Sequence, residues 1–251
     1  MTDCNVARNA RRLRKSMRPI AIFRFSETEG PAHFAEWLDR ERLPWRLIAI
    51  DAGDPIPADP CAFAGIGMMG GPMSVYEALP WIDPLSRLLR DAVDAKVPVI
   101  GHCLGGQLLA QALGARVHRT QTPEIGWIDV ETTDTPARAA WFGGHARFTP
   151  FQWHYDVFDV PTGATRVLTN GFNPNQAYVV DDRHIGFQVH IEMTDDLVRT
   201  WCRSGAGEIA GPGTPARQSR DEILRDLPER LAALQAIAGG VYARWVQKLA
   251  R

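Results

Sequence analysis

The residues best suited to chemistry lie in segment 97–110, where a short β-branched apolar run ends at Gly101 and a single cysteine precedes two more glycines. The pattern Gly-x-Cys-x-Gly around Cys103 is typical of a nucleophile elbow, a sharp turn between a strand and a helix that small neighbouring residues permit. The dipole and unpaired N–H groups at the start of that helix favour the thiolate, which is the nucleophilic form. A buried structural cysteine is the alternative interpretation.

A second segment, 184–192, is an apolar run that ends in His190 and Glu192. A thiol nucleophile needs a base to take its proton, and the base needs a third group to hold its ring and tautomer. Residues i and i+2 of an extended chain share a face, so the Glu192 carboxylate can reach the His190 imidazole. Cys103 and His190 both follow predicted strands, and open α/β sheets place their active sites at the carboxyl ends of strands. The sequence therefore predicts a cysteine nucleophile with a histidine base.

These motifs resemble those of the class I (triad) glutamine amidotransferases. The nucleophile segment 101–107, the base segment 186–192 and the Gly-Gly-Pro-Met-Ser loop at 70–74 occur in the family's order and spacing. The resemblance covers most of the chain. Two positions differ, because Ile191 stands where the family usually has proline and Gly106 stands where many members carry histidine. The first difference removes a rigid backbone angle but no catalytic atom.

The resemblance implies the roles of individual residues. Cys103 is implied to be the nucleophile, His190 the general base and acid, and Glu192 the carboxylate that orients His190. The backbone N–H groups of Gly71 and Leu104 are implied to form the oxyanion hole. Attack on an amide builds negative charge on oxygen, and fixed donors stabilise that charge by roughly 3 kcal/mol each.

The resemblance also implies where the amino-acid end of the substrate is held. A glutamine one helical turn after the nucleophile helps to hold it, and the loop at 152–156 grips the same end. The expected substrate-binding residues are Gln107, Trp153, His154 and Tyr155. His154 is a rival base by residue type, but its loop setting and the better match of His190 favour a wall or structural role.

The composition limits the class of protein. A chain of 251 residues that is 45% hydrophobic can bury a full core, and its net charge of −1 gives no reason to expect nucleic acid or an anionic membrane as a partner. The four cysteines have no metal-ligand spacing and are expected to be free thiols, which favours a reducing compartment. They are Cys4, Cys61, Cys103 and Cys202. No apolar run has the length of a membrane span or a signal core, so a cytoplasmic location is expected, with no metal and no cofactor.

Predicted strands and helices alternate through the first half of the chain. We expect strands at 19–25, 45–51, 62–69 and 97–101, and helices at 32–42, 83–94 and 104–113. Short β-like runs follow at 128–132, 147–153, 165–169, 176–180 and 185–190, and a capped helix is expected at 194–202. This order predicts an α/β fold, a three-layer, doubly wound, mostly parallel sheet of the flavodoxin-like kind. A short antiparallel extension and a C-terminal helical appendage complete it.

The run Gly-Ile-Gly-Met-Met-Gly at 65–70 formally matches a dinucleotide-binding fingerprint. Its first two glycines lie inside an apolar strand, and Gly71 and Pro72 follow where the fingerprint should open a helix. A strand that delivers the Gly70-Gly71-Pro72 loop is the better interpretation. The chain also has no Walker A sequence, so ATP use is not expected.

We expect three regions. Residues 1–18 form a basic leader, interpreted as a flexible solvated tail rather than a nucleic-acid arm or transit-like segment. Residues 19–204 form the amidotransferase-like catalytic domain, and 205–251 a linker and an amphipathic helix. Apolar residues at near-helical spacing predict that this helix packs on the domain, with partner docking or dimerisation as the alternative. They are Ile223, Leu224, Leu227, Leu231, Leu234, Ile237, Val241, Trp245 and Leu249.

The favoured function is hydrolysis of the γ-amide of glutamine, or of a γ-glutamyl amide, through a thioester on Cys103. Glutamate and either ammonia or an amine would be released. The alternatives are a stand-alone γ-glutamyl peptidase or hydrolase and a non-catalytic binding or regulatory subunit that retains the fold. The segment after Glu192 is too short for a synthetase domain, so an acceptor of ammonia is expected on a separate synthetase subunit, and a homodimer is the other assembly considered. The leaving group and the oligomeric state stay open.

Overall fold

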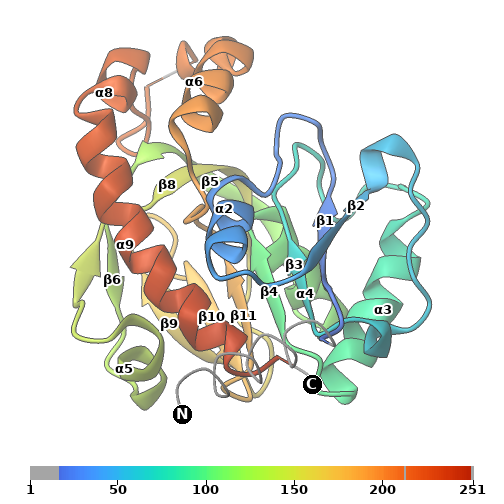
Figure 1. Ribbon diagram of the computed structural model, residues 1–251. Helices are drawn as coiled ribbons and strands as arrows, with labels where there is room; N and C mark the ends of the chain where they lie inside the picture. The colour runs from blue at the N-terminus through green and yellow to red at the C-terminus, as the bar shows by residue number, and fades with distance from the viewer. Residues whose placement is uncertain (1–16, 212, 250–251) are drawn as a thin grey trace.

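A sheet of nine strands, with helices on both faces, forms the centre of the computed structural model, which describes residues 17–211 and 213–249 (Figure 1). The strand order is β2-β1-β3-β4-β11-β10-β9-β6-β7, and β5 and β8 form a separate two-stranded sheet. This is the mostly parallel α/β architecture, with an antiparallel extension, that the alternation of elements predicts. The basic leader, residues 1–16 in particular, lies outside the described residues.

The first half of the described chain contains β1 (Ile20–Arg24), α2 (Ala32–Arg40), β2 (Trp45–Ala49), β3 (Gly65–Met68), α3 (Ile82–Asp94), β4 (Val99–His102) and α4 (Leu104–Ala112). The second half contains β5 (Val117–Trp127), β6 (Val130–Thr132), α5 (Pro136–Phe142), β7 (Arg147–Phe148), β8 (Phe151–Phe158), β9 (Thr165–Thr169), β10 (Ala177–Val180) and β11 (His184–Phe187). The last elements are α6 (Asp195–Ser204), α7 (Ala206–Ile209), α8 (Arg220–Leu224) and α9 (Leu227–Val246). Short 3₁₀ helices occupy Ile50–Ala52 and Pro60–Ala62.

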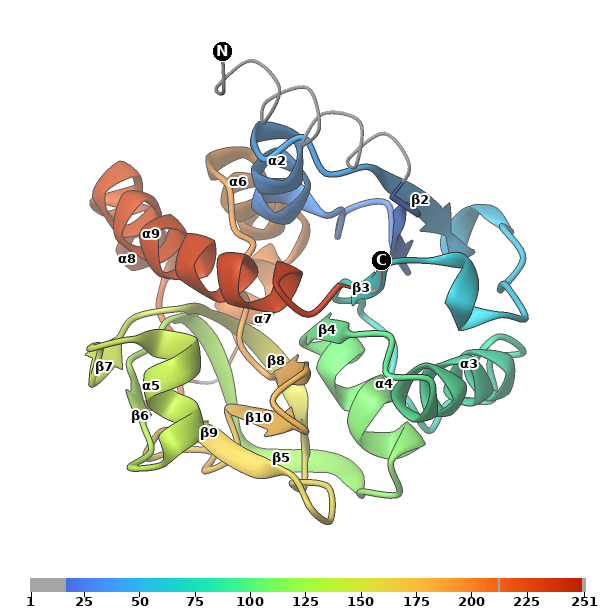
Figure 2. The same cartoon turned by 60° about the horizontal axis from the view of Figure 1, so that its bottom comes forward.

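The two faces of the sheet bury two separate apolar clusters. Ile20 and Ile22 of β1 point into the cluster under α2 and α9, whereas Ala21 and Phe23 point into the cluster under α3 and α4. This alternation follows from the two-residue period of a strand. Figure 2 shows the resulting layers, with α2 and α9 on one side of β3 and β4 and with α3 and α4 on the other.

The register of β4 against β11 positions the candidate site. These strands are parallel, with Gly101 opposite Gly186 and His102 opposite Phe187. The residues that follow the two strands therefore leave the sheet side by side at its carboxyl edge, which is where ligands bind in open α/β sheets. Beyond β11, strands β10, β9, β6 and β7 continue the sheet in antiparallel order.

Three elements lie outside the predicted runs. The structure has β5, a long strand whose polar first half lacks the apolar alternation of a half-buried strand, and two short helices, α5 and α7. The predicted C-terminal helix is two helices, because α8 ends before Arg225 and α9 begins after Asp226, whose φ of 51° is left-handed. A left-handed residue cannot continue an α-helix.

Helix α9 lies across the sheet and forms part of the core (Figure 1). Of the nine apolar residues expected to line the predicted C-terminal helix, which lie on α8, on α9 and just after it, six are buried, and Leu224, Ile237 and Leu249 are partly buried against the same cluster. Gly65 of β3 allows the close approach, since a Cβ there would lie 2.6 Å from Leu249 and 2.9 Å from Trp245. The glycine pattern at 65–70 thus has a packing cause.

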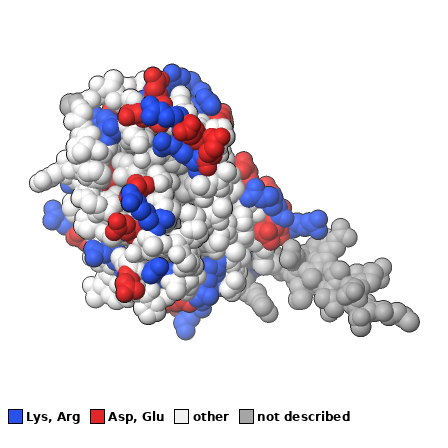
Figure 3. Space-filling model, turned by 90° about the vertical axis from the view of Figure 1, so that its left-hand side faces the viewer, with Lys and Arg blue, Asp and Glu red and all other residues white. Residues whose placement is uncertain are grey.

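The surface carries both charge signs. Figure 3 shows acidic and basic side chains interspersed on one face, in keeping with the net charge of −1. No helix in the described part of the chain combines the length and apolar character needed to cross a bilayer. Within the described residues, Cys61, Cys103 and Cys202 are free thiols.

The packing of α9 predicts the effect of shortening one of its buried side chains. Leu234 is 1% exposed, so Leu234→Ala should lower the free energy of unfolding by about 2–5 kcal/mol through lost burial and a cavity. Urea denaturation followed by tryptophan fluorescence measures this loss. Arg225→Ala, at an exposed position between α8 and α9, is the control and should change stability by less than about 0.5 kcal/mol. Equal stability of the two variants would contradict a core role for α9.

Candidate active site

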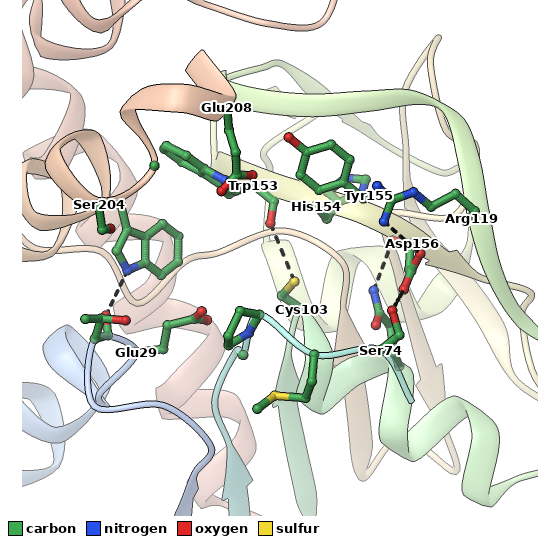
Figure 4. Close-up of a pocket in the computed structure, with 17 residues that line it drawn as sticks. Glu29, Ser74, Cys103, Arg119, Trp153, His154, Tyr155, Asp156, Ser204 and Glu208 are labelled. Atoms are coloured by element: carbon green, nitrogen blue, oxygen red, sulfur yellow. Dashed lines mark hydrogen bonds and ion pairs between the residues drawn. The ribbon is translucent and has the colours of Figure 1, made fainter. Parts of the chain in front are cut away.

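The candidate site is a pocket of about 360 Å³ at the carboxyl edge of the sheet (Figure 4). Its walls come from the β1–α2 loop, the loop after β3, the start of α4, strands β5 and β8, and the α6–α7 region. Cys103 lies at its centre in Figure 4, where Glu29 and Ser204 appear on one side and Ser74 and Arg119 on the other. Segments distant in sequence therefore meet around one thiol.

Cys103 occupies a strained turn between β4 and α4. Its φ of 47° and ψ of −108° are uncommon for a residue with a side chain, and it is the N-cap of α4. The turn needs glycines on both sides: a Cβ at Gly101 would lie 2.5 Å from the Gly105 backbone, and one at Gly105 would lie 2.6 Å from the carbonyl oxygen of Met68. This is the elbow geometry that the sequence predicts.

Gly106 is also fixed by packing. A Cβ at this position would overlap the carbonyl oxygen of Phe187 in β11. The close approach of α4 to β11 therefore excludes a larger residue in this chain, where many members of the resembling family carry histidine. The packing of α4 against the backbone of β11 therefore explains why glycine stands at position 106.

Gly71 and Leu104, the expected oxyanion donors, are neighbours. A Cβ at Gly71 would lie 2.6 Å from Cδ2 of Leu104, and Gly71 lines the pocket. Among the described residues, neither backbone N–H donates to a backbone acceptor, and the first N–H groups of a helix such as α4 have no partner within it. Both donors are free to meet a developing negative charge.

His190 and Glu192 form a buried pair. Nδ1 of His190 lies 2.6 Å from Oε1 of Glu192, and the two residues are 1% and 2% exposed. The backbone of His190 is anchored to β8 through two hydrogen bonds with Phe151, and the Glu192 carbonyl accepts from His33 N of α2. Because Nδ1 faces the carboxylate, Nε2 is the nitrogen left for a second partner, and Cys103 is close enough to affect the charge of the ring.

The pKa values of this pair move apart. Burial opposes the charged imidazolium, but Glu192 and the nearby Cys103 side chain outweigh it and raise the pKa of His190 well above its ordinary value. Burial opposes the carboxylate of Glu192 as well, yet His190 and His102 lower its pKa to about 2. Oε2 of Glu192 lies 3.9 Å from Nε2 of His102, a fully buried histidine. The site thus stabilises the protonated ring of His190 beside the carboxylate of Glu192.

Gln107 lies in the pocket wall but is committed to the protein. Its Nε2 donates to the backbone carbonyl of Asp156 at 3.0 Å and to Oε1 of Gln188 at 3.3 Å. Nε2 of Gln188 in turn lies 3.7 Å from Sγ of Cys103. The glutamine pair therefore connects α4, β8 and the residue after β11. The side-chain amide of Gln107 is bonded to the backbone of β8 rather than pointing freely into the pocket.

Trp153, His154 and Tyr155 all line the pocket, as expected from the sequence. The backbone oxygen of Trp153 is 3.9 Å from Sγ of Cys103. His154 is 3% exposed and its Nε2 lies 3.2 Å from Oε2 of Glu124, a fully buried carboxylate on β5. This pairing gives His154 a structural partner, away from the pair at His190.

Sequence reasoning missed several residues of the pocket. Asp156 accepts hydrogen bonds from the hydroxyls of Ser74 and Tyr76 and lies 3.6 Å from Arg119. Glu29, Trp201 and Glu208 also line the pocket, from the β1–α2 loop, α6 and α7. The position of Gln188 near the site was predictable from the sequence, because this residue precedes His190 by two positions in the same extended segment. Asp156 lies on β8 and ends the 152–156 segment singled out in the sequence, whereas Glu29, Trp201 and Glu208 come from a loop and two helices whose position no local pattern specifies.

The arrangement is suited to acyl transfer. It combines a thiol on a strained turn, a histidine oriented by a carboxylate and two free backbone donors beside the thiol. No group of three or more His, Cys, Asp or Glu side chains within residues 17–211 and 213–249 is placed to hold a metal ion.

The sequence matches a known family model, described as "Glutamine amidotransferase class-I", over residues 42–198. A glutamine amidotransferase-like protein of Salmonella typhimurium is 29% identical over 190 residues, which cover 72% of this chain and 79% of the relative. GMP synthase [glutamine-hydrolyzing] of Thermomicrobium roseum is 33% identical over 184 residues, covering 70% of this chain and 33% of the relative. The chain thus spans about a third of the length of this GMP synthase.

Solved structures of glutamine amidotransferases are also similar to this chain. A glutamine amidotransferase from Methylobacillus flagellatus superposes with a TM-score of 0.92 at 46% identity, covering 94% of this chain and 97% of that chain. A glutamine amidotransferase from Thermotoga maritima superposes with a TM-score of 0.80 at 25% identity, covering 91% and 98%. In both comparisons the similarity extends over more than nine tenths of this chain.

The electrostatics of the pair predict a titration shift. Glu192→Gln should lower the pKa of His190, because burial still opposes the imidazolium while the carboxylate that favours it is gone. As pH rises, the ring of His190 should therefore lose its proton at a lower pH in the variant than in the wild type. NMR titration of the histidine ring protons, assigned with a His190→Gln variant, measures this.

The matched control is Glu229→Gln, at an exposed position near the start of α9. It should leave the pKa of His190 unchanged. A His190 pKa in Glu192→Gln equal to or above the wild-type value would contradict the stabilisation of the imidazolium by Glu192.

Proposed function

The chain belongs to the class I glutamine amidotransferases, and on this basis we propose that it cleaves the γ-amide of glutamine, or of a γ-glutamyl amide, through a thioester on Cys103. The products are glutamate and ammonia or an amine. The observation that carries the proposal is the convergence of Cys103 on its strained turn with the buried His190–Glu192 pair. A binding protein has no need of a strained nucleophile beside an oriented base.

In the first half-reaction the Cys103 thiolate attacks the γ-carbonyl carbon and a sulfur–carbon bond forms. The carbonyl oxygen takes the negative charge, and hydrogen bonds from the N–H groups of Gly71 and Leu104 stabilise it. The tetrahedral species collapses as the carbon–nitrogen bond breaks, and the His190 imidazolium gives its proton to the departing nitrogen. Ammonia or an amine leaves, and a γ-glutamyl thioester stays on Cys103.

In the second half-reaction His190, now neutral, takes a proton from water as the water oxygen attacks the thioester carbon. The same two N–H groups again stabilise the negative charge on the carbonyl oxygen. Collapse breaks the carbon–sulfur bond, releases glutamate and restores the thiolate beside the imidazolium. Glu192 transfers no proton in either step; it holds Nδ1 of His190 and stabilises the charged ring.

The other side of the pocket fits the amino-acid end of the substrate. Asp156 presents a carboxylate that suits an α-ammonium group, and Arg119 presents a guanidinium that suits an α-carboxylate. Tyr155 stacks under Arg119, with 4.4 Å between the guanidinium carbon and the ring centroid, and so helps to orient it. In this proposal the glutamyl group extends from Cys103 towards these residues.

The protein that accepts the released ammonia is also part of the proposal. The GMP synthase relative is about three times as long as the region it shares with this chain. We propose that an acceptor for ammonia, where one is used, is a separate synthetase subunit, with a homodimer as the other assembly. Glutamate release measured without and with a candidate synthetase distinguishes a channelling enzyme, which accelerates with its partner, from a hydrolase that works unaided.

Replacement of the nucleophile provides the main test. Cys103→Ser should reduce glutamate release by at least roughly 10³-fold with the fold intact, because a hydroxyl is a far weaker nucleophile than a thiolate. The glutamine analogue 6-diazo-5-oxo-L-norleucine should add once to the wild type, at Cys103, as seen by intact and peptide mass spectrometry. Cys61→Ser, at an exposed cysteine, is the control and should react like the wild type. A folded wild type that gains no adduct would favour a non-catalytic subunit.

The base and its orienting carboxylate should differ in effect. His190→Ala removes the group that moves protons, whereas Glu192→Gln keeps an imidazole in place and should be the milder change. Steady-state kcat values for the two variants measure the order. Loss of more activity in Glu192→Gln than in His190→Ala would assign the proton transfer to another group.

A further inference from the structure

The side of the pocket next to His190 has a distinctive chemistry. It is formed by Glu29, Trp153, Trp201 and Glu208, which we call the tryptophan–glutamate arm. The arm combines two indole rings with two carboxylates. Figure 4 shows Glu29 and Glu208 away from Ser74, Asp156 and Arg119, the residues of the opposite side.

Glu29 brings a carboxylate close to the reacting atoms. A Cβ placed on Gly70 would overlap Oε2 of Glu29 and lie 3.0 Å from Cε1 of His190, so both side chains meet above the same glycine. The carboxyl group is largely shielded from solvent, and that burial raises its pKa to about 7 against the attraction of His190. No hydrogen bond to the Glu29 side chain occurs among the described residues. The attraction to a positive group comes from His190, a ring that is already paired with Glu192.

The two tryptophans form the walls of the arm. Trp201 packs edge-on against His190, with ring centroids 4.7 Å apart, and its indole N–H donates to Thr28 O at 2.8 Å, which fixes the loop that carries Glu29. Trp153 and Trp201 lie edge to face at 6.0 Å. Indole faces attract cations through their quadrupole, and they do so best where the cation is partly desolvated.

Glu208 completes the arm at its rim. Its Oε2 accepts from the Trp153 indole N–H at 3.0 Å, so the carboxylate is held in place. Gly205, between α6 and α7, permits this arrangement, because a Cβ there would overlap the Trp153 ring. Among the residues that line the pocket, Arg119 is the one with a permanent positive charge, and it lies on the opposite side.

The position of His190 decides which part of the substrate meets the arm. His190 gives its proton to the departing nitrogen, so that nitrogen lies beside the imidazole at cleavage. The glutamyl chain and the leaving group extend in opposite directions from the scissile carbonyl. With the glutamyl group on the side of Asp156, the leaving group points towards the tryptophan–glutamate arm.

We infer that the arm binds a leaving amine that carries a second, positively charged group, so that the substrate class is the γ-glutamyl amides of diamines and related cationic amines. The inference rests on the proposed function, since it requires hydrolysis at Cys103. The pocket volume of about 360 Å³ falls in the range of sites that hold ligands of drug size, which leaves room for a leaving group beyond the glutamyl part. A distal ammonium there meets two carboxylates and two indoles.

Three substrates of matched length test this inference. The γ-glutamyl amides of 1,4-diaminobutane, n-pentylamine and 5-aminopentanoate end in an ammonium, a methyl and a carboxylate group. Glutamate release should give a kcat/KM at least about tenfold higher for the ammonium compound than for the methyl compound, with the carboxylate compound slowest. Glutamine serves as the fourth substrate, and its kcat/KM should not exceed that of the ammonium compound.

Variants of the arm give the second readout. Glu208→Gln and Glu29→Gln should each lower the ratio of kcat/KM between the ammonium and methyl compounds severalfold, whereas the exposed control Glu229→Gln should leave that ratio unchanged. Glu208 is exposed, so its variant is expected to fold. Equal rates for the three amides, an unchanged ratio in Glu208→Gln, or a preference for glutamine of more than tenfold would each overturn the inference. Absence of glutamate release from all four substrates would instead refute the proposed function and, with it, this inference.

Discussion

The parallel pairing of β4 with β11 is the contact on which the candidate site depends. With His102 opposite Phe187, the chain leaves both strands at the same edge, and Cys103 and Gln188 emerge as neighbours. Glycines at the strand–helix turn allow α4 to lie against both strands, and any side chain there would collide with backbone. If this register slipped by one residue, the side chains after each strand would point to the opposite face.

Burial then sets the electrostatics of the site. His190 and Glu192 are almost completely removed from water, and a buried charge is tolerated only with a partner. Each compensates the other, and the nearby Cys103 side chain also favours the charged form of His190. Glu29 differs from this pair, because its shielded carboxyl is attracted to His190 but that ring already pairs with Glu192. The tryptophan–glutamate arm therefore adds two carboxyl groups to the pocket, and the positive side chain that lines the pocket, Arg119, lies on the opposite side.

Local patterns were enough to predict most of the strands and helices and the candidate residues that follow β4 and β11, but not β5, α5 or α7. The strands, the elbow at Cys103 and the neighbouring pair at 190 and 192 are each encoded within a few residues, because strand period and turn chemistry are local. Glu29 and Glu208 were not predictable, since they come from a loop and a short helix that meet through tertiary packing. The polar start of β5 and the left-handed Asp226 were missed for a similar reason, because neighbouring elements rather than propensity determine those conformations.

The central claim is a covalent γ-glutamyl thioester on Cys103, and a rapid acid quench tests it most directly. Wild-type protein mixed with glutamine or a γ-glutamyl amide labelled in the carbon chain, quenched during turnover and digested, should yield a labelled peptide that contains Cys103. Hydroxylamine should remove that label, as expected of a thioester. Release of labelled glutamate while the Cys103 peptide stays unlabelled throughout the time course would contradict the account.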